Sequence, residues 1–141
     1  MSDSGNRGKR ILVVEDEPVI AAVVKRVLTA MGLEVDTVTN GMEAQDIIPK
    51  KHYDLYLVDI RTPAMNGKEL YEWMKQVLPR VAEHVIFTTG DLITGDTETF
   101  LKQSGRSFLP KPFRPDELKI IIDKALKEER DARRSSWCSG R

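Results

Sequence analysis

The sequence predicts an α/β fold in which five parallel strands form a doubly wound sheet with five helices packed on its two faces. Short apolar runs typical of buried strands alternate with stretches whose apolar residues recur at helical spacing, and five such strand–helix pairs follow one another. Consecutive parallel strands need crossover connections, which are right-handed and carry the helices. At 141 residues the chain has room for one domain of this kind and not for two.

The strand predictions rest on short apolar segments. Residues 11–14, 55–58 and 85–87 are continuous apolar runs, which are typical of strands covered on both faces. Residues 33–38 alternate between apolar and polar side chains, and residues 107–109 form a fifth, shorter segment. The first, third and fourth strands are therefore expected to be buried on both faces.

The helix predictions rest on apolar spacing and on the residues that start and stop helices. Pro18 and Pro115 stand where a first helical turn tolerates proline, whereas Gly32 and Pro79 follow apolar stripes and end them. Asp96 is expected to cap a short helix. The five helices are predicted over residues 18–31, 44–48, 70–78, 96–103 and 115–126.

Composition argues against membrane-spanning and nucleic-acid-binding proteins. Lys plus Arg and Asp plus Glu both number 22, so the formal net charge is zero, and the longest apolar run has six residues. The basic N-terminus has no apolar signal core and the single Cys138 cannot form an internal disulfide, which predicts a cytoplasmic protein. We expect a flexible lead over residues 1–8, a folded domain over 9–127, and a charged helix end and tail over 128–141.

Polar residues follow four of the five predicted strands, where the chemistry of such a sheet is expected. In parallel α/β sheets the ligand site lies beyond the carboxyl ends of the strands, which meet along one edge. The strand-end residues are Glu15, Asp16 and Glu17 after the first strand, Asp59 after the third, Thr88 and Thr89 after the fourth, and Lys111 after the fifth. We therefore expect carboxylates, a hydroxyl and an ammonium around one pocket.

These residue types favour phosphoryl transfer assisted by Mg²⁺. Carboxylates that lie together repel one another unless a proton or a cation intervenes, and oxygen ligands suit a hard cation such as Mg²⁺. His52 and His84 lack the spacing of zinc ligands. A carboxylate beside Mg²⁺ with a lysine and a hydroxyl opposite has the parts to attack a phosphoryl group, and Asp59 would become an aspartyl phosphate.

Four segments of the chain resemble the response-regulator receiver domain of two-component signalling. They are ILVVEDEP at residues 11–18, DIRTPAMNG at 59–67, FTTG at 87–90 and FLPKPF at 108–113. The resemblance covers roughly residues 9–127 and implies a flavodoxin-like fold with strand order 2-1-3-4-5. It also implies a signalling domain of a phosphorelay that catalyses only its own phosphorylation and dephosphorylation, rather than an enzyme with a separate substrate.

The resemblance assigns a role to each matching residue. It implies that Asp59 is the phosphoacceptor, with Thr88 and Lys111 completing the catalytic set, and that Thr88 and Phe108 form the switch. For Mg²⁺ it implies Asp16 as a direct ligand, Glu15 as an acid acting through water, Asp59 itself, and the backbone carbonyl of Arg61. A cis peptide bond is expected before Pro112.

Three positions, Glu15, Thr89 and Phe108, depart from the usual pattern of the family. Aspartate is also common at the position of Glu15, and little change is expected from this difference. Thr89 follows Thr88 where a smaller residue is favoured, which implies tighter access to the phosphoryl group. Phe108 has no hydroxyl, so its switching would rely on packing alone. Arg61 and Gly90 stand at positions that tune self-dephosphorylation in the family.

The resemblance also implies partners. The phosphoryl donor would be a histidine kinase or a histidine phosphotransfer protein, and a downstream protein would read the face formed by the fourth predicted helix, the fifth strand and the fifth helix. We expect no nucleic-acid or membrane partner and no DNA-binding output domain in this chain. A homodimer stays open, as does the choice between a free-standing regulator and a receiver from a hybrid kinase.

The same residues also have other interpretations. Asp16 and Glu17 favour the following helix through its dipole even without a ligand, Lys111 between two prolines suits a solvated loop, and Thr88 suits an ordinary strand. A magnesium-dependent phosphohydrolase generally needs a second acid two residues after the nucleophile, where this chain has Arg61. A scaffold that is never phosphorylated would have lost an acid or the lysine, and all are present.

Overall fold

The computed structural model describes the backbone of residues 8–90 and 95–139 and the side chains of residues 8–90 and 95–129. Its strands are β1 (Arg10–Val14), β2 (Glu34–Val38), β3 (Leu55–Asp59), β4 (Val85–Thr89) and β5 (Phe108–Pro110). Its helices are α1 (Pro18–Ala30), α2 (Gly41–Ile47), α3 (Gly67–Val77), α4 (Pro79–Ala82), α5 (Gly95–Ser104) and α6 (Pro115–Ser139), with a 3₁₀ turn at Ile48–Lys50.

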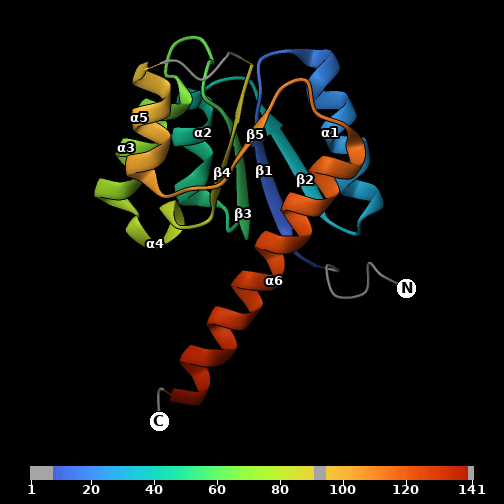
Figure 1. The fold of residues 1–141 in the computed structure, drawn as a ribbon, viewed down its shortest axis with the longest axis vertical. Coiled ribbons are helices and arrows are strands. Elements are labelled where there is room, and N and C mark those ends of the chain that lie inside the picture. The colour runs from blue at the N-terminus through green and yellow to red at the C-terminus, as the bar shows by residue number, and fades with distance from the viewer. Residues whose placement is uncertain (1–7, 91–94, 140–141) are drawn as a thin grey trace.

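The strands form one parallel sheet with the order β2-β1-β3-β4-β5, which confirms the predicted doubly wound sheet and its strand order. Figure 1 shows α1 and α6 on one side of the sheet, and α2, α3, α4 and α5 on the other. The order reverses at β1, whose two neighbours are β2 and β3. In such a sheet the crevice for a ligand opens at the carboxyl ends of the strands on either side of that reversal.

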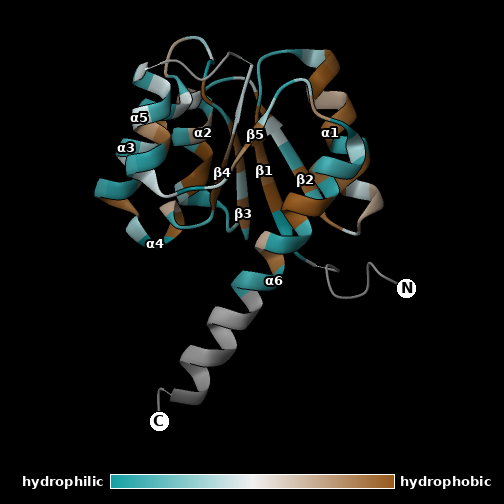
Figure 2. Ribbon diagram, in the orientation of Figure 1, coloured by the Kyte–Doolittle hydropathy of each residue, from teal (hydrophilic) through white to brown (hydrophobic). Residues whose placement is uncertain are grey.

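Two hydrophobic cores, one on each face of the sheet, explain the continuous apolar runs. Successive residues of a strand point to opposite faces, so Leu12 and Val14 enter the core under α2–α5 while Ile11 and Val13 enter the core under α1 and α6. Each core is closed by helical side chains, such as Leu70 of α3 and Leu118 of α6. Apolar ribbon accordingly runs through the centre of the molecule in Figure 2.

The prediction of five helices was wrong by one, because α4 is a separate turn. Leu78 has φ −138° and ψ 65°, which ends α3, and Pro79 then begins the short helix Pro79–Ala82. A residue before proline is disfavoured in the helical region, which is why the chain breaks there. The prediction that Asp96 precedes its helix was also wrong, because α5 begins at Gly95 and Asp96 lies in its first turn.

The last helix, α6, is 25 residues long. It runs past the edge of the sheet where the strands begin, which is opposite to their carboxyl ends (Figure 1). Leu118, Ile122 and Leu126, spaced by four residues, bury its first half against the sheet. At the lower edge Lys9 Nζ lies 3.5 Å from a carboxylate oxygen of Glu129, which ties the helix to the start of β1. Residues 1–7 of the predicted lead and residues 140–141 of the predicted tail lie outside the described residues.

Among the helices that the structure describes, none combines the length and the apolar character needed to cross a lipid bilayer.

Candidate functional site

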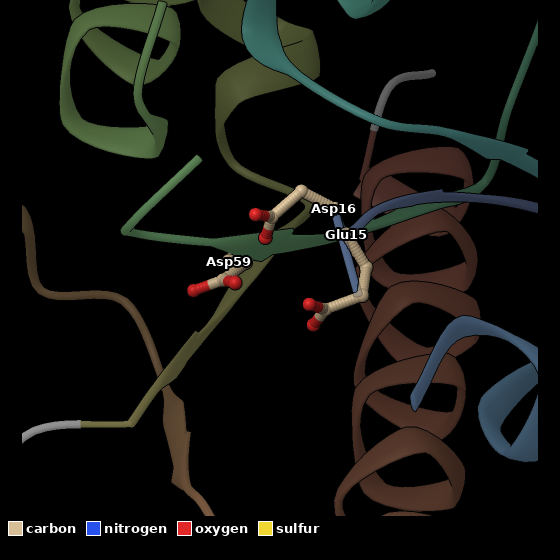
Figure 3. Close-up of side chains that lie close together, drawn as sticks. All are labelled: Glu15, Asp16 and Asp59. Atoms are coloured by element: carbon tan, nitrogen blue, oxygen red, sulfur yellow. The ribbon is translucent and has the colours of Figure 1, made fainter. Parts of the chain in front are cut away.

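Three carboxylates meet at the ends of β1 and β3. Val14 pairs with Val58 in the register of these strands, so the residues that follow, Glu15 and Asp59, come to lie side by side. One oxygen each from Glu15, Asp16 and Asp59 lie within 4.8 Å of one another, and Figure 3 shows the three side chains directed toward a common space. Glu15 and Asp59 are buried, and Asp16 is the most exposed of the three.

The two oxygens of Asp59 have different partners. The backbone N–H of Arg61 donates to Oδ1 at 3.0 Å, and the ammonium of Lys111 donates to Oδ2 at 3.0 Å. The backbone is held as well, because the N–H of Ile60 donates to the carbonyl of Thr88 on β4 at 2.9 Å. The carboxylate is therefore oriented from β3, from the loop that follows it, and from the segment after β5.

Lys111 links the acids from the opposite side of the site. Its Nζ lies 2.7 Å from Glu15 Oε1 and 3.8 Å from Glu17 Oε1, in addition to its contact with Asp59, and its side chain is only 10% exposed. These contacts and this burial exclude the interpretation of Lys111 as a solvated loop residue. The Lys111–Pro112 peptide bond is cis, as predicted.

The acids and the lysine shift one another's ionisation. Burial alone would lower the pKa of Lys111, but hydrogen bonds to Glu15 and Asp59 and the charges of these carboxylates outweigh burial and raise this pKa. Burial raises the pKa of Glu15, and the charge of Asp59 adds to the rise, while the hydrogen bond from Lys111 opposes it. Lys111 thus remains an ammonium, whereas Glu15 is held in a setting that disfavours its charge.

The loop between β3 and α3 is held against the rest of the site by its own residues. The carbonyl of Met65 accepts from the hydroxyl of Thr62 at 2.9 Å and from the backbone N–H of Gly41, the first residue of α2, at 2.8 Å. Asn66 and Glu69 then form a reciprocal capping box at the start of α3. These contacts fix the loop that brings the N–H of Arg61 to Asp59.

Thr88 and Phe108 lie on the strands next to the acids. Thr88 of β4 is buried and pairs in register with Asp59 of β3. Phe108 of β5 pairs in register with Phe87, is half-buried, and packs against the core under α2–α5 rather than among the acids. Thr89 is also buried, and its carbonyl accepts from the N–H of Lys111 at 2.7 Å.

The donor set fits a hard divalent cation. Glu15, Asp16 and Asp59 carry three negative charges when ionised, and the ammonium of Lys111 balances one of them. The remaining charge of minus two and the all-oxygen donors suit Mg²⁺. No second group of three such acids, histidines or cysteines was found in the part of the chain that the structure describes.

Sequence reasoning missed the contact between Glu17 and Lys111. It placed Glu17 among the strand-end acids and in the dipole of the helix that follows, but it named no partner for the carboxylate. Glu17 is the N-cap residue of α1 and its side chain makes no capping hydrogen bond. Its carboxylate lies near Lys111 instead. The run of three acids, Glu15 to Glu17, was the signal for this position, but the direction of the third side chain depends on where the chain after β5 returns.

Comparison with known proteins agrees with this geometry. Residues 11–123 match the sequence family described as the response regulator receiver domain. The DNA-binding transcriptional regulator NtrC of Klebsiella pneumoniae is 35% identical over 115 residues, which cover 81% of this chain and 24% of that protein. The chain spans between 24% and 54% of the length of the first curated relatives that it matches.

Solved structures have the same fold. A CheY-like response regulator receiver domain protein of Methanospirillum hungatei has a TM-score of 0.80 at 30% identity, over 88% of this chain and 98% of that chain. The response regulator TrrA of Thermotoga maritima, solved in complex with Mg²⁺ and BeF, has a TM-score of 0.71 at 32% identity, over 83% of this chain and 98% of that chain. With its strand order, its strand-end acids and the family match over residues 11–123, the chain belongs to the response regulator receiver domains of two-component signalling.

Proposed function

We propose that this receiver domain is switched by Mg²⁺-dependent phosphorylation of Asp59. The observation that carries the proposal is the position of the Asp59 carboxylate, held between the N–H of Arg61 and the ammonium of Lys111 beside two further acids. A carboxylate oriented in this way is a nucleophile whose approach to phosphorus is set in advance. The resident lysine supplies positive charge where a phosphoryl group would arrive.

The residues divide the work of phosphoryl transfer. An oxygen of Asp59 forms a bond to the phosphorus of the donor, and the bond from phosphorus to the donor's leaving group breaks with its electron pair. Lys111 shifts its hydrogen bond from Asp59 Oδ2 to the incoming phosphoryl oxygens, and the Thr88 hydroxyl donates to another. Glu15, Asp16, Asp59 and the backbone carbonyl of Arg61 would hold Mg²⁺, which when bound neutralises charge on the phosphoryl oxygens.

Substitution of Asp59 tests the phosphoacceptor directly. Incubation with acetyl phosphate and Mg²⁺ should add one phosphoryl group to the wild-type chain, measured as intact mass, and Asp59→Asn should abolish the adduct because an amide is a poor nucleophile. Asp46→Asn, an exposed aspartate on α2, should keep it. An adduct of equal yield on Asp59→Asn, or none on the wild type, would contradict the proposal.

The switch would connect Asp59 to the face formed by α5, β5 and α6. Thr88 lies between Asp59 and the neighbouring β5 strand, and Phe108 on β5 is only half-buried, so part of its ring is still available for burial. Movement of Thr88 toward a phosphoryl group would open space into which Phe108 repacks. New charge-assisted hydrogen bonds would therefore shift the population between two packings of one face, which a downstream protein reads.

Thr88→Ala separates phosphorylation from switching. Phosphorylation of the wild type should change backbone amide hydrogen exchange in α5 and β5. Thr88→Ala should still accept the phosphoryl group but lose most of this change, because it lacks the hydroxyl that would move toward the phosphoryl group. Hydrogen exchange with mass detection measures both. Thr89→Ala is the matched control on the adjacent residue, and an unchanged exchange response in Thr88→Ala would refute this role.

The phosphoryl donor would be a histidine kinase or a histidine phosphotransfer protein that docks beside the acids. Val19 and Val23, one turn apart on α1, are 76% and 45% exposed, and α1 begins two residues after Asp16. This exposed apolar surface on α1 supports a protein contact there during transfer. Output would likewise pass through protein contact.

A further inference from the structure

We propose that Glu17 is a specificity-determining residue that makes the site disfavour phosphodonors in proportion to their negative charge. This inference rests on the proposed role of Asp59 as the phosphoacceptor. Glu17 lies outside the three clustered acids and its carboxylate lies 3.8 Å from Lys111 Nζ, so the proposed role rests on its charge and is not that of a catalytic residue.

The backbone places Glu17 at the rim of the site. Its N–H donates to Glu15 Oε2 at 3.1 Å, and the helix α1 begins at the next residue, Pro18. The side chain is 61% exposed, in contrast to the buried Glu15, and it leaves the N-cap of α1 without a side-chain hydrogen bond. The usual N-cap side chains are the shorter Ser, Thr, Asp and Asn, so the longer Glu17 side chain is not held at the start of α1 and lies near Lys111 instead.

Lys111 does not need Glu17 as a counter-ion. Glu15 and Asp59 already lie 2.7 and 3.0 Å from its Nζ, and the third carboxylate, at 3.8 Å, adds negative charge beyond what the ammonium balances. With Asp16, the rim therefore carries an excess of negative charge on the side of β1 and α1. Saturating Mg²⁺ would offset the acids that bind it, but not Glu17, which lies outside the clustered three.

An exposed charge at this position acts on an approaching anion. For a separation of about 6 Å in a medium close to water, Coulomb's law gives about a threefold lower rate for each negative charge of the donor. A dianion would thus be disfavoured about tenfold and a monoanion about threefold by Glu17. A phosphohistidine presented by a protein brings its own surrounding charges, so the same residue would favour a protein donor over small dianionic phosphates.

The experiment compares two small donors on the full chain at saturating Mg²⁺ and low ionic strength. Acetyl phosphate is mainly a dianion near neutral pH, and phosphoramidate carries one net negative charge. Glu17→Gln should raise the phosphorylation rate about tenfold with acetyl phosphate and about threefold with phosphoramidate, and salt at about 0.5 M should remove most of both gains. Glu17→Asp, which keeps the charge, should stay close to the wild type.

Matched controls separate charge from structure. Glu72→Gln makes the same charge change on an exposed site of α3 and should leave both rates unchanged. Equal gains with the two donors in Glu17→Gln, no gain with either, or a gain that survives high salt would overturn the inference. A wild-type chain that forms no adduct with either donor would instead overturn the proposed function itself, and the inference with it.

Discussion

Lys111→Met is expected to lower the free energy of unfolding by about 3 kcal/mol in Mg²⁺-free buffer near neutral pH, because it leaves buried carboxylates without their cation. Glu15 and Asp59 are each only 4% exposed at the side chain, and both depend on the same ammonium. The same change should slow phosphorylation by about 100-fold or more, since the phosphoryl oxygens lose a positioned donor.

The loss of stability should be reversed by conditions that replace the missing charge. If Mg²⁺ binds at the acids as proposed, it should restore a large part of the stability of Lys111→Met, without restoring phosphorylation to the wild-type rate. Urea unfolding with and without Mg²⁺ measures the first effect and intact mass the second. Lys119→Met on the exposed face of α6 is the control, and a stability loss of equal size there would contradict the explanation.

The pH dependence of the free energy of unfolding follows from the directions of the pKa shifts of Lys111 and Glu15. Lys111 has a raised pKa in the folded state, so its contribution to wild-type stability is complete below the ordinary lysine pKa of 10.5 and disappears as pH rises through the folded-state value. Glu15 also has a raised pKa, so the folded state binds more protons than the unfolded state above the ordinary value of 4.5. Wild-type stability should therefore decrease as pH rises through that acidic window, and the Lys111→Met defect should shrink as pH falls.

The fold was predictable because the burial of a strand is indicated by the residues of that strand alone. Residues 11–14 and 55–58 are apolar without interruption, and the structure buries alternate members in different cores. The number of helices was not predictable to the same degree, because it depended on the backbone angles of Leu78. Apolar spacing indicates which residues face the core, but it does not indicate where one turn ends and a new one begins.

The candidate site was predictable to the extent that it follows from strand ends. Once the sheet is parallel, Glu15 and Asp59 must share an edge, and the structure brings Lys111 to them. The roles of Thr88 and Phe108 stay predictions, since register alone places them. The contact of Glu17 with Lys111 and the backbone hydrogen bond from Gly41 to Met65 join segments that are distant in the chain. No local pattern indicates which distant segments meet in this way.

Gly67→Ala is the second change with a large expected effect, because it should push the start of α3 away from the end of β3. A Cβ at Gly67 would lie 2.6 Å from the backbone carbonyl oxygen of Asp59 and 2.9 Å from Cα of Ile60. Both neighbours are backbone atoms of the strand end, so they cannot rotate away as a flexible side chain would. We expect a loss of about 2–3 kcal/mol in the free energy of unfolding.

The same displacement should reach the chemistry. Gly67 also donates its N–H to the carbonyl of Ile60 at 2.9 Å, so moving it shifts the loop that brings the N–H of Arg61 to Asp59. Phosphorylation by acetyl phosphate should slow about tenfold or more at saturating Mg²⁺, given how steeply such reactions depend on the placement of the nucleophile. Rates at a temperature where the variant remains folded separate this effect from lost stability.

Gly95→Ala is the matched control, because Gly95 is likewise the first residue of a helix, but among the residues that the structure describes no atom lies within 4 Å of an added Cβ. Alanine there should be neutral or stabilise by up to about 1 kcal/mol, because it restricts the unfolded chain and has the higher helix propensity. If Gly67→Ala behaved like Gly95→Ala in both unfolding and phosphorylation, close packing of α3 against the end of β3 would not be what orients Asp59. A defect confined to Gly67→Ala would instead indicate that the start of α3 orients Asp59 through its close packing against backbone atoms at the end of β3.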